Sequence, residues 1–333
     1  MADRALIAGG AGFIGLHLAR ELCERGREVT IVDNFFRARA DAELRDLLRE
    51  VELVEHDLTQ PLPESLDRGY AEVYHLAAVV GVQRSGEVPQ EVLRINLRAA
   101  LNVFDWCASH APERVFLAST SEVADAGAKL GLGAVPVSEA APVAIADVML
   151  PRASYAVSKL AGEVLLINYA RAYGFAARIA RYHNVYGPRM GHDHVIPQLI
   201  DRVLDGRDPF PIFGAHQTRA FCHVRDAVDA TVALMELATP EPLLVNVGND
   251  REEIAILDLV ERLFAIADVS PEIAIEAPPP GSPDRRRPNL DLLRRLTAFE
   301  PTVSLHEGLV DTYRWYLADR RRAGGLAKTP RAA

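Results

Sequence analysis

Tyr155 and Lys159 stand four residues apart in the stretch SYAVSK, a spacing that places both side chains on the same side of a helix. A free tyrosine has a pKa of about 10 and is a poor base at neutral pH, but a lysine ammonium beside it, together with an oxidised cofactor ring, favours the phenolate. Thr120, in the stretch STSE, adds a hydroxyl that can hydrogen-bond the same substrate oxygen. This trio predicts an enzyme that takes a proton from a hydroxyl group while the adjoining carbon gives a hydride to an oxidised cofactor.

A tyrosine and a lysine at this spacing also occur on ordinary amphipathic helices, so the surrounding elements matter. The stretch ALIAGGAGFIG, residues 5–15, begins as a short buried strand and passes through glycines into a helix. In a dinucleotide-binding turn one glycine allows the tight bend, the next lets a pyrophosphate approach the backbone, and the last lets the helix pack close to the strand. Gly9, Gly12 and Gly15 take these three places.

Asp33 ends a second strand, residues 28–32, about 20 residues beyond the glycines. A carboxylate there accepts both ribose hydroxyls and repels a 2′-phosphate, so the sequence predicts NAD rather than NADP. Arg37 and Arg39 follow closely, and we interpret them as solvated charges. The other predicted cofactor contacts, besides Tyr155 and Lys159, follow strands or lie on helices: Phe13, Ile14, Asn34, Asp57, Leu58, Leu76, Ala77, Ala78 and Asn96.

Composition limits the classes of function. With 333 residues, 49% of them apolar, the chain can bury a large core, and its net charge of −9 argues against nucleic-acid or anionic-membrane partners. Three widely spaced cysteines suggest neither a disulfide framework nor a zinc site. His192 and His194 lack a third ligand, so no metal is predicted. The chain has neither an apolar run of the roughly 18 residues a membrane span needs nor a signal-peptide core, so we expect a cytoplasmic protein.

Apolar strands at 51–55, 72–76 and 114–118 alternate with helical stretches near 39–49, 91–109 and 154–173. This βαβ pattern predicts an α/β fold, a Rossmann-type doubly wound parallel sheet with a smaller C-terminal substrate-binding lobe. We expect the NAD-binding domain at 1–181, with a return at about 220–248. The lobe would then comprise 182–219 and 249–318, and 319–333 would be a disordered tail.

The motifs GGAGFIG, VDNFF, HLAA, STSE, SYAVSK and HNVYGPRM, in this order, resemble the extended short-chain dehydrogenase/reductases that remodel nucleotide sugars. The resemblance runs from about residue 3 to residue 315. It implies transient oxidation of the sugar C4 hydroxyl by NAD, chemistry on the 4-keto intermediate, and return of the hydride. It also implies a homodimer formed through the helices near 91–109 and 154–173.

Three branches of this family differ in the middle step. Dehydratases carry an acidic residue directly after the threonine, where this chain has Ser121, and simple 4-epimerases carry no glutamate in this serine-rich segment. UDP-glucuronate decarboxylases resemble the chain most closely, in Thr-Ser-Glu, in PRASY at 151–155, in GPRM and in QTRAF at 217–221. That resemblance places Thr120, Ser121 and Glu122 with the catalytic pair, and Arg286 near the sugar carboxylate, with Arg285 or Arg287 as alternatives. It implies substrate contacts from Asn184, Arg189 and Arg219.

Two departures keep a second function open. The chain reads Val123-Ala124-Asp125 where most members read Val-Tyr-Gly, followed by an expected long loop at 126–146 over the sugar pocket. The stretch MGHDHVIP at 190–197 is more similar to sugar epimerases. A 4-epimerase acting on UDP-glucuronate or a related UDP-hexose is therefore the alternative. A non-catalytic NAD-sensing protein is less expected, because such proteins typically lose the Tyr/Lys pair that this chain keeps.

Overall fold

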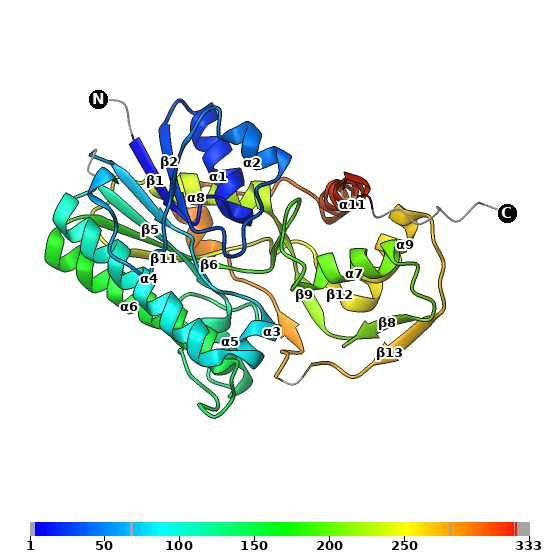
Figure 1. Ribbon diagram of the computed structural model, residues 1–333. Helices are drawn as coiled ribbons and strands as arrows, with labels where there is room; N and C mark the ends of the chain where they lie inside the picture. The colour runs from blue at the N-terminus through cyan, green and yellow to red at the C-terminus, as the bar shows by residue number, and fades with distance from the viewer. Residues whose placement is uncertain (1–3, 67–68, 280, 323, 325–333) are drawn as a thin grey trace.

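The computed structural model describes residues 4–66, 69–279, 281–322 and 324. Its largest element is a seven-stranded, entirely parallel sheet in the order β11-β6-β5-β4-β1-β2-β3 (Figure 1). Most of its strands are nearly continuous buried runs because both faces are covered. The strands are β1 (Arg4–Ala8), β2 (Glu28–Asp33), β3 (Glu52–Glu55), β4 (Glu72–His75), β5 (Arg114–Thr120), β6 (Ala176–Tyr182) and β11 (Leu243–Val247).

Helices cover both faces of this sheet, and each face has its own apolar core (Figure 1). One face carries α1 (Phe13–Glu24), α2 (Ala42–Leu47), α8 (Val224–Met235) and α10 (Asp291–Thr297). The other carries the long, mutually packed helices α4 (Pro89–His110) and α6 (Ala153–Tyr173), with the short α3 (Val82–Glu87), η1 (Glu64–Leu66) and α5 (Glu122–Lys129) nearby. The predicted doubly wound Rossmann-type class is confirmed.

A smaller lobe with a third core lies beside the sheet (Figure 1). Its two parts are separated in sequence, because the chain returns to the sheet through α8 and β11, where β11 pairs with β6. The first part holds β7 (Val185–Tyr186), α7 (Val195–Leu204), β8 (Phe210–Phe213), β9 (Thr218–Ala220) and β10 (Cys222–His223). The second holds β12 (Glu253–Ala255), α9 (Ile256–Ala267), β13 (Ile273–Glu276), β14 (Arg285–Arg286) and α11 (Leu305–Arg322).

Two expectations about irregular segments are wrong at one end only. The expected loop at 126–146 begins as the last turn of α5, while residues 130–146 are irregular as expected, and Gly127 packs so closely on the returning chain that a Cβ there would lie 2.1 Å from the Pro142 carbonyl oxygen. The expected disordered tail begins too early, because α11 continues to Arg322. Asp319 pairs with Arg39 and Arg320 with Asp205, which fixes this last turn. Residues 323 and 325–333 lie outside the described part of the chain.

One predicted helix is shorter than expected. The stretch predicted helical at 39–49 is helical only over α2, because the Asp41 side chain accepts the Leu44 amide 2.9 Å away and caps the helix there. Within the described residues, no helix combines the length and apolarity that a membrane span requires.

Candidate active site

A cavity of about 750 Å³ opens at the carboxyl ends of the central strands, where a doubly wound sheet binds its ligands. Its lining includes every predicted catalytic and cofactor residue, together with Asn184, Arg189 and Arg286. Arg219 is the predicted site residue that is absent from the lining. Its guanidinium instead contacts the Thr218 carbonyl at 2.7 Å, Gln217 Oε1 at 3.2 Å and Ser282 Oγ at 3.1 Å.

The glycines of the first loop leave no room for side chains. Gly9 has φ +87°, and a Cβ there would lie 2.6 Å from the Ala77 amide nitrogen. A Cβ at Gly15 would lie 2.3 Å from the Gly9 carbonyl oxygen, so this glycine allows α1 to start directly behind the turn. No side chain caps α1 and no acidic residue occupies its first turn. Its free amides therefore face the cavity and suit a phosphate group.

Asp33 is held at the end of β2 by backbone amides. Its Oδ2 accepts the Ala11 amide at 3.1 Å and its Oδ1 accepts the Phe35 amide at 2.9 Å. Burial raises the pKa of this carboxyl, while the amide bonds and Arg189 oppose the rise. Each oxygen keeps acceptor capacity for a ribose hydroxyl. Together with the uncapped α1, this donor and acceptor set fits NAD.

Two other predicted cofactor residues bind neighbouring chain segments. The Asn96 side chain accepts the Val79 amide at 2.7 Å and donates to the Val79 carbonyl and to Ser158 Oγ, both at 3.1 Å. It therefore ties the loop after β4 to α6. The Asp57 side chain accepts the Thr59 amide at 2.9 Å within its own turn. Both side chains shape the cavity wall.

Thr120 at the end of β5 and Tyr155 and Lys159 in the first turns of α6 meet in the cavity. The Thr120 hydroxyl hydrogen-bonds the Tyr155 phenol, and Lys159 Nζ donates to the Ala118 carbonyl at 2.8 Å. Burial lowers the pKa of Lys159 to about 8, against an opposing effect of Glu163.

The Tyr155 phenol is protonated in the chain alone, without the oxidised nicotinamide ring that the expected phenolate also needs. Burial and the Glu122 carboxylate raise its pKa above the ordinary value, and this outweighs the opposing effects of Thr120, Arg37 and Arg286. The chain alone therefore keeps the proton on Tyr155.

Glu122 lies between two guanidinium groups. Its Oε1 accepts from Arg152 Nη2 at 3.0 Å, and Arg286 Nη2 lies 3.9 Å from the same oxygen. Burial favours the neutral acid, but Arg152 and Arg286 together bring the pKa of Glu122 below its ordinary value. Glu122 is consequently an anion at neutral pH.

Of the three consecutive arginines, Arg286 alone is in the cavity lining. Its Nη1 donates to Asn184 Oδ1 at 3.4 Å, and the Asn184 amide in turn donates to the Ala220 carbonyl at 2.9 Å. Arg285 instead pairs with Glu253 at 2.6 Å, and Arg287 donates to the Asp250 carbonyl at 3.0 Å. Of the three arginines, Arg286 is thus the one placed to contact a molecule in the cavity.

Arg189 has a different set of partners from the expected substrate. Its side chain is almost fully buried and donates to Asp41 Oδ2 at 2.7 Å and to the carbonyls of Ala11, Gly12 and Arg39 at 2.7, 3.1 and 2.9 Å. These acceptors belong to the loops around the cofactor site. Arg189 therefore binds the loops that form the site.

Three of the cavity residues that the sequence did not predict act on Tyr155 or Glu122 by charge. Arg152 pairs with Glu122, and its place three residues before Tyr155 in PRASY was the available signal. Arg37, interpreted as a solvated charge, lines the cavity 3.9 Å from Asp193. His194 also lines it, and burial followed by Arg37 lowers its pKa to about 4.

His192 lies outside this group, with Nδ1 2.6 Å from Asp201 and Nε2 2.7 Å from Arg39. Within residues 4–66, 69–279, 281–322 and 324, no three His, Cys, Asp or Glu side chains are grouped to hold a metal.

Comparison with known proteins gives a consistent family. The model of the NAD dependent epimerase/dehydratase family matches residues 5–248. UDP-N-acetyl-alpha-D-glucosaminuronate decarboxylase of Bacillus cytotoxicus is 33% identical over 327 residues, 95% of this chain and 98% of that protein. UDP-glucuronic acid decarboxylase 3 of Arabidopsis thaliana is 33% identical over 314 residues, 92% of this chain and 86% of that protein.

Among solved structures, the UDP-glucuronic acid 4-epimerase of Bacillus cereus, in complex with UDP-glucuronic acid and NAD, matches with a TM-score of 0.83 and 28% identity. The match covers 95% of this chain and 99% of that one. The predicted enzyme class and cofactor are confirmed, and the chain belongs to the NAD dependent epimerase/dehydratase family.

Proposed function

We propose that this enzyme decarboxylates UDP-glucuronate through transient oxidation at C4. The observation that carries the proposal is the group formed by Glu122, Arg152 and Arg286 beside the Tyr155 phenol. Simple C4 oxidation and reduction needs only Thr120, Tyr155 and Lys159, so an additional, partly buried carboxylate held between guanidiniums indicates chemistry at a neighbouring carbon. Relatives named as hexuronate decarboxylases support the same choice.

The first step uses the residues at the end of β5 and the start of α6. Tyr155 takes the proton of the C4 hydroxyl, and Thr120 hydrogen-bonds the same oxygen. When bound, NAD would supply the acceptor and later the donor of the C4 hydride, and the positive charge of its oxidised ring. Lys159 supplies the second cation near the phenol when it is protonated, so both favour the phenolate that burial opposes.

Oxidation at C4 makes the substrate carboxylate a β-keto acid group. The bond from C5 to the carboxylate carbon can then break, and its electron pair passes to the C4 carbonyl as an enolate while CO2 leaves. The protonated Tyr155 and Thr120 hydrogen-bond the enolate oxygen at C4, Arg286 orients the sugar carboxylate, and the Glu122 anion disfavours a carboxylate beside it. C5 then takes one proton from water, C4 regains the hydride, and Tyr155 returns its proton to the C4 oxygen.

The alternative is 4-epimerisation of UDP-glucuronate or a related UDP-hexose. The same Thr120, Tyr155 and Lys159 would oxidise C4, and the 4-keto sugar would rotate before the hydride returned. The solved 4-epimerase with UDP-glucuronic acid and NAD favours this candidate.

Product mass tests both functions. The purified chain is incubated with UDP-glucuronate and NAD, and with UDP-N-acetylglucosaminuronate as a second substrate, and the products are separated and weighed. We expect a UDP-sugar lighter than the substrate by CO2. A new isobaric peak would assign the epimerase, and an unchanged substrate in both incubations would overturn the proposal.

We also propose that the chain forms a homodimer through α4 and α6. These two helices pack together on one outer face of the sheet (Figure 1). They expose the apolar side chains Leu101 on α4 and Val164 on α6, of which Val164 is 53% exposed. Covering this surface would remove apolar area from water.

A further inference from the structure

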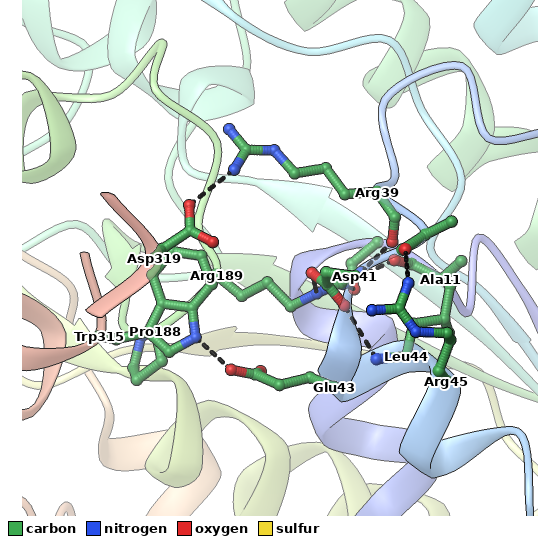
Figure 2. A network of polar contacts seen from close by, with 12 residues as sticks. Ala11, Arg39, Asp41, Glu43, Leu44, Arg45, Pro188, Arg189, Trp315 and Asp319 are labelled. Carbon is green, nitrogen blue, oxygen red and sulfur yellow. Dashed lines mark hydrogen bonds and ion pairs between the residues drawn. The ribbon is translucent and has the colours of Figure 1, made fainter. Parts of the chain in front are cut away.

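Arg189 connects the smaller lobe to the cofactor site. It lies in the loop between β7 and α7, in a left-handed backbone conformation with φ +70°. Its side chain is 4% exposed and extends into the space between the glycine loop and the loop after β2 (Figure 2). A residue strained in this way and buried at its charged end is held by its contacts.

The contacts with the glycine loop act on the peptides that start α1. Arg189 Nη1 donates to the Ala11 carbonyl at 2.7 Å and to the Gly12 carbonyl at 3.1 Å. The Gly12 carbonyl belongs to the same peptide group as the Phe13 amide, the first amide of the uncapped α1. A guanidinium on the carbonyl side polarises that peptide and adds positive charge behind the helix N-terminus. Both effects favour an anion on the cavity side.

The contacts with the second loop hold residues 34–41 in place. Arg189 Nη2 donates to the Arg39 carbonyl at 2.9 Å, and its Nε donates to Asp41 Oδ2 at 2.7 Å. The other Asp41 oxygen caps α2 through the Leu44 amide. Asp41 therefore joins the start of α2 to Arg189, and one buried guanidinium binds both chain segments that border the dinucleotide (Figure 2).

Further contacts around this pair come from α11. Arg39 pairs with Asp319 at 3.0 Å and Trp315 donates to Glu43 (Figure 2). The Arg39 side chain is 51% exposed, so its ion pair is worth little in water. The Arg189–Asp41 pair contributes most to the stability of this network, because removing one partner leaves the charge of the other without compensation inside the protein.

We propose that Arg189 is a positioning residue for NAD, which holds the glycine loop and residues 34–41 closed around the dinucleotide and so keeps it bound between turnovers. This role of Arg189 concerns only the bound cofactor and does not depend on which sugar the enzyme takes as its substrate. Arg189 thereby makes cofactor retention depend on the docked smaller lobe.

The test measures NAD itself. Wild-type, Arg189→Met and Arg189→Lys chains are purified, NAD is released by denaturation and counted per chain, and the rate at which bound NAD exchanges with labelled NAD is followed. We expect Arg189→Met to lose NAD about tenfold faster or more, a change of about 1.4 kcal/mol. Arg189→Lys should fall between, because an ammonium cannot reach all four acceptors.

Arg320→Met is the matched control, since it removes an arginine of α11 that pairs with Asp205 and is not part of the cavity lining, and its NAD exchange should stay close to wild type. Asp41→Asn is the second variant: it keeps a capping oxygen for α2 and removes only the charge that pairs with Arg189. It should speed NAD loss, and the double variant should add little to Arg189→Met.

Unchanged NAD exchange in a folded Arg189→Met chain would overturn the proposal, above all if binding of UDP were weakened instead. If Arg189→Met does not fold, the NAD exchange rate of Asp41→Asn becomes the test. A rate equal to that of wild type in this variant would overturn the proposal. If wild type is isolated without NAD, the Kd of added NAD is compared across the same variants, with the same expected order.

Discussion

The Tyr155 phenol illustrates how burial and charge compete at a single residue. Burial and Glu122 hold its proton, and the sequence predicted a phenolate only with the Lys159 ammonium and an oxidised nicotinamide ring together. The base is therefore formed only when further positive charge is present in the cavity. This dependence suits an enzyme that should abstract a proton only when its oxidised cofactor is bound.

Replacing Tyr155 with Phe removes the base while keeping the ring. We expect kcat to fall by about 10²–10⁴-fold, because general base catalysis is lost. Turnover of UDP-glucuronate is the measurement, and the NAD content of the purified variant is the control. Near wild-type turnover with NAD still bound would contradict the assigned role of Tyr155.

Glu163 is expected to set the alkaline limb of the pH profile. Burial lowers the pKa of Lys159 to about 8 and Glu163, one helical turn on, opposes that shift. The useful ammonium is present below this pKa and lost as pH rises through it. Removing the Glu163 charge lowers the pKa of Lys159 further, so Glu163→Gln should move the alkaline limb to lower pH.

The profile of kcat against pH from about 6 to 10 checks this shift. Glu163 also pairs with Arg181 at 2.7 Å in the buried core. A loss of stability alone would reduce activity equally at all pH values, so a profile of unchanged shape would contradict the prediction.

Arg152 is expected to act through Glu122. It lowers the pKa of that carboxyl, so the anion persists to lower pH than in an ordinary glutamate. Arg152→Gln should raise the pKa of Glu122 and move the acidic limb of the profile to higher pH. Arg152→Lys should restore part of the shift, since it returns a positive charge. If the acidic limb lies at the same pH in wild type, Arg152→Gln and Arg152→Lys, Arg152 does not control the pKa of Glu122.

Among the elements, the turn between β1 and α1 leaves the least space. Gly15→Ala would place a Cβ 2.3 Å from the Gly9 carbonyl and 2.8 Å from Gly10 Cα, both backbone atoms. We expect a loss of about 1–3 kcal/mol or more in the free energy of unfolding, together with loss of NAD. Denaturant unfolding and NAD content measure the two effects.

Gly86→Ala is the matched control for this substitution. Gly86 lies in α3, and a Cβ there has no neighbour within 4 Å. Alanine should stabilise the helix by up to about 1 kcal/mol. Similar losses of stability at both positions would contradict the steric argument.

The elements that the sequence predicted well are those with a local signal. The strands are short apolar runs, and α4 and α6 keep their expected positions within two residues or so, because burial of these segments follows their hydrophobic pattern. The second half of α5 had no such pattern, since alanines and a glycine occupy residues 126–128. Gly127 was predicted to be a loop residue, whereas it lies in α5, where the absence of a side chain allows the carbonyl of residue 142 to pack against the helix.

At the scale of the whole molecule, the site was predictable where chemistry comes from local motifs. The glycine loop, Asp33 and the residues of STSE and SYAVSK all line one cavity. The partners of Arg189 were not predictable, because Ala11 lies 178 residues away in sequence. The same holds for Arg219, whose contacts depend on the loop that brings Ser282 beside it.

The proposed dimer is also tested at this scale. Leu101→Asp combined with Val164→Asp places charges on the α4–α6 face, and both side chains are already in contact with solvent in the single chain. Light scattering should report a dimer for wild type and a monomer for the double variant, with unchanged circular dichroism. A wild-type monomer at micromolar concentration would contradict the proposal.

β11 completes the sheet only after the chain has left it to begin the smaller lobe. During synthesis β6 is thus an open edge until residues 243–247 have emerged from the ribosome, and such an edge readily pairs with foreign strands. The lobe cannot be removed or exchanged as one continuous segment, because α8 and β11 of the sheet domain separate its two parts in the sequence. A transplanted lobe would therefore have to keep both crossings to the sheet intact.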